Sequence, residues 1–96
     1  MDIDVKEFLI KAIAEWKLIH KDLQKTMPPV TKVTFVKGLK ESISAVSTIL
    51  KNEGETEVAE ILVRYEKEVA KYIAIPALLT PKTIKQLDKI LDEVEL

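Results

Sequence analysis

The helix-breaking residues of this chain decide which of its segments can form regular structure. Apolar residues recur at the 3.6-residue period of an α-helix in four stretches, and Pro28, Pro29, Gly54, Pro76 and Pro81 separate them. Proline lacks an amide hydrogen and disfavours the helical conformation of the residue before it, so helices are expected to end before Pro28 and before Pro76, while Pro81 suits the first position of a helix. The sequence therefore predicts an all-α fold, a four-helix antiparallel bundle with short connections, in a single domain over residues 1–96.

The expected helices cover residues 4–26, 34–52 and 56–75 and a last stretch from Pro81 onward, with Thr80 as its N-cap. One face of each helix is apolar and is predicted to face the core. The side chains expected there are Val5, Phe8, Leu9, Ala12, Ile13, Trp16, Ile19, Leu23, Val36, Leu39, Ile43, Val46, Ile49, Leu50, Val58, Ile61, Leu62, Tyr65, Val69, Tyr72, Ile73, Ile84, Leu87, Leu91 and Val94.

One window allows a second interpretation. Residues 30–36, with the sequence Val-Thr-Lys-Val-Thr-Phe-Val, are rich in β-branched side chains and could form a short strand. A single strand would need a partner strand from another chain. The pattern leaves open whether these residues form a strand or the start of a helix.

The composition argues against several classes of protein. The chain has no cysteine, which removes disulfides and thiolate metal sites and fits a cytoplasmic protein. No segment has the roughly eighteen consecutive apolar residues of a membrane helix, so no membrane partner is expected. Ile, Leu, Val, Lys and Glu are abundant while Gln and Asn are scarce, a bias shared with proteins of heat-loving organisms.

No pattern in the chain indicates catalysis. The positions three and four residues from the only histidine, His20, supply neither a second catalytic group nor a second metal ligand, so a structural role is expected for it. Asp88 and Asp92 share a helix face but are too few to hold a divalent cation, and a solvated acidic surface is expected there. These two acids, with Glu93 and Glu95, oppose the dipole of the last helix, which a basic partner would relieve. Phosphate-loop and hydrolase motifs are absent. We therefore expect a protein that is not an enzyme, without catalytic, metal-binding or cofactor-binding residues and without a cofactor.

The first helix carries apolar side chains on the face opposite its core stripe. These residues are named here the apolar ridge: Ile3, Ile10, Ala14 and Leu18. An exposed contiguous apolar surface usually marks a protein contact. The alternative is a central helix that is buried on two sides within the monomer.

Lysines concentrate in the first half of the chain. Residues 1–51 hold nine lysines against six acids, whereas residues 52–96 hold six basic residues against ten acids. Between Lys17 and Lys51 the only acids are Asp22 and Glu41. Six residues of this lysine tract are candidate contacts to phosphate or to an acidic partner: Lys17, Lys21, Lys25, Lys32, Lys37 and Lys40. Lysine without arginine or interleaved aromatic residues is also typical of a solvated surface.

Residues 31–73 resemble a ribbon-helix-helix DNA-binding module, with a strand over residues 31–35 and a turn at residues 53–56 between two helices. The resemblance implies a dimeric transcription regulator in which Lys32 and Thr34 enter the major groove. In that family the strand usually lies near the start of the chain, whereas here a long helix and two prolines precede it. This is the alternative function.

Residues 64–87 look like the end of the helical domain of archaeal GINS subunits, where a basic amphipathic helix precedes a Leu-Thr-Pro helix start, here at residues 79–81. GINS subunits are longer and carry a small β domain that this chain lacks. Its size and charge would also suit a small helical subunit of an archaeal B-family DNA polymerase. Both likenesses imply an accessory subunit that binds a larger protein in DNA replication or another nucleic-acid transaction. Nucleic acid itself and a second copy of the chain are further candidate partners.

Overall fold

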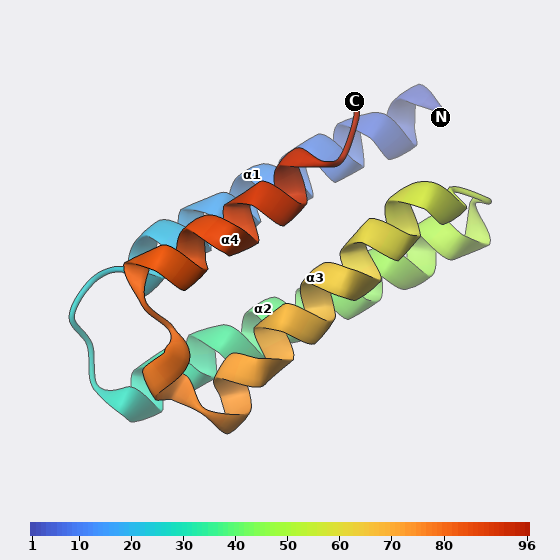
Figure 1. Ribbon diagram of the computed structural model, residues 1–96. Helices are drawn as coiled ribbons and strands as arrows, with labels where there is room; N and C mark the ends of the chain where they lie inside the picture. Colours follow the sequence, from blue (N-terminus) through green and yellow to red (C-terminus); the bar gives the residue numbers. More distant parts are fainter.

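A computed structural model describes residues 1–96, and helices are its only regular secondary structure (Figure 1). The elements in chain order are α1 (Ile3–Leu23), α2 (Pro29–Asn52), α3 (Thr56–Ala74), the 3-10 helix η1 (Pro76–Leu78) and α4 (Pro81–Asp92). Each α-helix runs antiparallel to the one before it, which confirms the predicted antiparallel four-helix bundle. No helix combines the length and the apolar composition that crossing a membrane requires.

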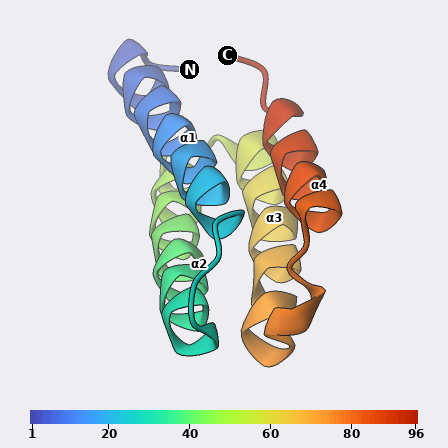
Figure 2. The ribbon, with the colours of Figure 1, turned by 90° about the vertical axis from the view of Figure 1, so that its left-hand side faces the viewer.

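The four helices lie in two layers. Figures 1 and 2 together show α1 alongside α4 and, beneath them, α2 alongside α3. The contact between α2 and α3 is the most extensive, and α1 packs against both α2 and α4. Both chain termini and the turn between α2 and α3 lie at the same end of the bundle. One face of α1 is left without a neighbouring helix.

Local chemistry accounts for the helix boundaries after α2. Gly54 adopts a φ of 78°, which only glycine reaches without strain, and Glu55 N donates to Leu50 O over 2.9 Å while Gly54 N donates to Lys51 O over 3.1 Å. These two bonds form a Schellman motif that ends α2. The expected N-cap of α4 is confirmed, because Thr80 Oγ1 accepts from Thr83 N and Pro81 takes the first helical position.

The second helix starts earlier than predicted. Pro29 is its first residue, so residues 30–36 are helical and the alternative of a strand is wrong. Proline is favourable at a first helical position because the amide hydrogen it lacks would have no acceptor there. Thr34 Oγ1 also bonds Val30 O one turn back, so this β-branched residue is accommodated in the helix. The ribbon-helix-helix alternative loses the strand through which that family dimerises and contacts DNA.

The core is one cluster of buried side chains from all four α-helices, together with Leu79 before α4 and Val94 after it. Trp16 lies fully buried within it, where its Nε1 donates to Ser42 Oγ over 2.9 Å. Its ring packs against that of Tyr65 in a tilted arrangement, with the ring centroids 5.7 Å apart. Two predicted core residues are wrong, because Phe8 and Ile49 are 40% and 42% exposed. Phe8 directly precedes Leu9 and is therefore turned by about 100° from the centre of the core stripe.

Replacement of a central leucine tests this description of the core. We expect Leu62→Ala to lower the free energy of unfolding by about 2–5 kcal/mol, because Leu62 is fully buried and its loss leaves a cavity. Leu78→Ala is the matched control, since Leu78 is exposed, and should change the stability by less than about 0.5 kcal/mol. Urea unfolding followed by circular dichroism measures both. Equal losses in the two variants would contradict the placement of Leu62.

Candidate functional site

The apolar ridge lies on the face of α1 that no other helix covers. Ile3, Ile10 and Leu18 are 69%, 45% and 59% exposed, and Ala14 between them is exposed as well. The alternative of a central helix buried on two sides is therefore wrong for this chain. The opposite face of α1 carries Leu9, Ile13 and Trp16 into the core. The apolar ridge is therefore a strip of exposed apolar surface that does not belong to the core.

A buried polar network fixes the rotation of α1 about its axis. His20 is 1% exposed, its Nδ1 lies 2.6 Å from Asp88 Oδ1 on α4, and its Nε2 lies 2.5 Å from the Tyr65 hydroxyl on α3. With the imidazole neutral, Nδ1–H donates to the carboxylate and Nε2 accepts the hydroxyl hydrogen, so no buried polar atom of the network lacks a partner. The structural role expected of His20 rests on these two bonds.

The protonation states agree with this assignment. Burial lowers the pKa of His20 from its ordinary value of 6.5, an effect opposed by the hydrogen bond and charge of Asp88 and reinforced by Lys17. Burial also raises the pKa of Tyr65 strongly, and the charge of Asp88 adds to this. The imidazole and the phenol therefore remain neutral near pH 7. Tyr65 and His20 are both buried, so these two groups of the network link α1 and α3 within the core.

Sequence reasoning missed Asp88 and Tyr65 as partners of His20. It considered only positions within one turn of the same helix, whereas these partners lie 68 and 45 residues away. One signal could have found them: a histidine and a tyrosine on core-facing stripes each require a hydrogen-bond partner once buried. The expectation of a solvated acidic surface at Asp88 and Asp92 is corrected for Asp88, whose Oδ1 is bonded to His20.

The acids at the end of α4 find basic partners within the chain. Asp92 Oδ1 pairs with Lys17 Nζ on α1 over 2.7 Å, and Glu93 Oε1 pairs with Arg64 on α3 over 2.7 Å. These exposed pairs are each worth about 0–1 kcal/mol. They provide inside the monomer the positive charge that the sequence suggested a separate partner would supply.

The lysine tract is not one continuous surface. Lys17 is held by Asp92, and Lys25 pairs with Asp22 over 3.1 Å, so these two ammonium groups are already engaged. The others have no acid within ion-pair distance, and they are divided between α1 and α2: Lys21, Lys32, Lys37 and Lys40. Lys37 and Lys40 lie within one turn of each other on α2.

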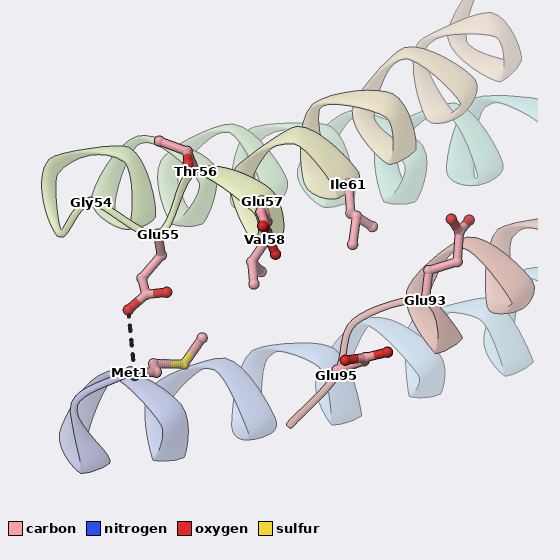
Figure 3. A pocket seen from close by; sticks show the side chains of 9 residues that line it. All are labelled: Met1, Gly54, Glu55, Thr56, Glu57, Val58, Ile61, Glu93 and Glu95. Atoms are coloured by element: carbon pink, nitrogen blue, oxygen red, sulfur yellow. Dashed lines mark ion pairs between the residues drawn. The ribbon is translucent and has the colours of Figure 1, made fainter.

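An acidic hollow opens at the end of the bundle where the termini meet (Figure 3). It has a volume of about 570 Å³ and is lined by Glu55, Glu57, Glu93 and Glu95 together with Val58 and other residues near the start of α3. The amino group of Met1 lies 3.8 Å from Glu55 Oε1, as the dashed line in Figure 3 marks. No group of three or more His, Cys, Asp or Glu side chains is placed to hold a metal ion.

The chain matches no protein-family model, no curated protein and no solved structure.

Removal of the Tyr65 hydroxyl tests the buried network. We expect Tyr65→Phe to lower the free energy of unfolding by about 1–3 kcal/mol, because His20 Nε2 is left in the core without a donor. Tyr72→Phe is the matched control, since Tyr72 is also buried but makes no hydrogen bond within the chain. Chemical denaturation measures both variants. A loss of equal size in both would show that the hydroxyl of Tyr65 is not specifically required.

The pH dependence of stability tests the protonation state of His20. Its folded pKa is below the unfolded value of 6.5, so the unfolded chain binds the proton more tightly. The stability that His20 contributes is therefore complete above about pH 6.5 and decreases as the pH falls below it, by at most about 1.4 kcal/mol per pH unit.

Three groups face the imidazole in this measurement: Asp88 from α4, Tyr65 from α3 and Lys17 from its own helix. The measurement is the free energy of unfolding between about pH 7.5 and about pH 5.5, a window that lies above the ordinary carboxylate pKa values. In His20→Gln we expect this decrease to be absent. An unchanged pH slope in that variant would assign the titration to another group.

Proposed function

We propose that this protein is a non-enzymatic interaction subunit of a larger assembly and that the apolar ridge of α1 is its interface. The exposure of Ile3, Ile10 and Leu18 along one helix carries the proposal. Solvent-exposed branched apolar side chains contribute nothing to the core of the monomer, and burying them against another protein is favourable by about 25 cal/mol per Å². The proposal includes a cytoplasmic location and requires no cofactor.

DNA replication or another nucleic-acid transaction is the context we favour for this assembly. The likeness of residues 64–87 to the helical domain of archaeal GINS subunits supports it, as does the excess of lysine in the first half of the chain. Lys21, Lys32, Lys37 and Lys40 have no acid partner in the monomer, so their ammonium groups are available to phosphate or to acidic side chains. Phosphate contacts would come from Lys32, Lys37 and Lys40 and not from Lys17 or Lys25, which Asp92 and Asp22 hold.

A charge on the ridge tests the interface. We expect Leu18→Asp to leave the helical circular dichroism and the stability nearly unchanged, because Leu18 is 59% exposed, and to abolish complex formation. Complex formation is measured by affinity capture from nuclease-treated extract of the source organism with identification of the retained proteins. Leu78→Asp is the matched control, since Leu78 is also exposed but lies in η1, away from the ridge. Unfolding of Leu18→Asp would place Leu18 in the core and contradict the proposal.

A further inference from the structure

The exposed face of α1 has a two-fold pattern centred on Ala14. Ile10 precedes Ala14 by four residues and Leu18 follows it by four. Glu7 precedes it by seven residues, and Lys21 follows it by seven. Positions three, four and seven residues apart share one face of a helix, so these residues form a single seam along the ridge. All of them are exposed in the monomer.

This pattern matches an antiparallel pair of α1 helices. If the two helices cross at Ala14, Ile10 of each copy lies at the level of Leu18 of the other, so apolar meets apolar. Glu7 of each copy lies at the level of Lys21 of the other, so opposite charges meet twice. The alanine at the centre carries the smallest side chain of the seam, which lets the two helices approach at the short end of the usual 8–10 Å range.

The charges of the seam are free to make these contacts. Neither Glu7 nor Lys21 forms an ion pair within its own chain. A parallel pair would instead place Lys21 against Lys21 and Glu7 against Glu7, which repels at both positions. The orientation of the contact therefore follows from the sign of two side chains.

We propose that a second copy of this chain covers the part of the apolar ridge from Ile10 to Leu18, docked through α1 in an antiparallel pair that crosses at Ala14. This inference rests on the proposed function of the ridge as an interface and names its partner. A contact made by one helix face from each copy is at the small end of specific interfaces. The dimer therefore dissociates on dilution, in contrast to an obligate dimer.

A charge exchange tests the orientation and register. Sedimentation equilibrium of the wild type over about 1 μM to about 1 mM should show a monomer–dimer equilibrium in this range of weak affinities. Glu7→Lys and Lys21→Glu should each weaken the dimer by about tenfold, because each creates two like-charged contacts. The double variant, Glu7→Lys with Lys21→Glu, restores both attractions and should recover the wild-type dissociation constant. All variants change exposed residues, so circular dichroism should show an unchanged fold.

Cross-linking supplies a second measurement. The chain has no cysteine, so Ala14→Cys introduces a single thiol. At the crossing point this thiol faces the same thiol of the second copy, close enough to form a disulfide. Mild oxidation should give a disulfide-linked dimer of Ala14→Cys and little of Ala45→Cys, the matched control at an exposed alanine of α2.

A monomer at every concentration, or equal cross-linking of the two cysteine variants, would overturn the inference. Failure of the double charge variant to recover the dimer would overturn the antiparallel register. The two proposals fail separately. A wild-type monomer whose capture of a different protein is lost in Leu18→Asp overturns the second copy and leaves the ridge standing as an interface. Unfolding of Leu18→Asp overturns the interface itself.

Discussion

The buried imidazole of His20 links three of the four helices through two hydrogen bonds, one to Asp88 on α4 and one to Tyr65 on α3. A buried polar atom that loses its partner costs about 1–3 kcal/mol, so α1 cannot rotate about its axis without breaking this network. The indole of Trp16 restrains the same helix through Ser42 on α2. This rotation of α1 is also what turns the apolar ridge toward solvent. The stability of the bundle and the availability of its proposed interface therefore depend on the same buried contacts.

The charges divide into those satisfied inside the monomer and those left outside. Lys17 and Arg64 neutralise acids at the end of α4, where carboxylates would otherwise oppose the helix dipole. Glu7 and Lys21 have no such partner and lie along the apolar ridge. Unpaired charges of opposite sign beside exposed apolar groups are what an electrostatically oriented interface requires. The ion pairs within the chain thus narrow the set of residues available to a partner.

Local signals predicted most of the fold. Thr80 with Pro81, and the glycine at position 54, marked helix boundaries because capping depends only on neighbouring residues. The β-branched run after Pro29 is ambiguous in the sequence. The difference between its strand and helix propensities is small, and tertiary contacts can outweigh it. Periodicity places Phe8 at the margin of the core face of α1. It does not show how much of that face the neighbouring helices cover, and Phe8 is in fact exposed. The sequence identifies the residues of the apolar ridge, but it does not show whether they are exposed or buried.

The sequence by itself determined the four helices, their antiparallel order and the existence of a second apolar face on α1, because these follow from residue spacing and from proline and glycine chemistry. Only the tertiary structure decided that this face is open, that His20 meets Asp88 and Tyr65, and that Lys17 is occupied by Asp92. Each of these facts concerns residues far apart in the chain. Their contact depends on how the helices pack and rotate against each other, and no local pattern specifies that.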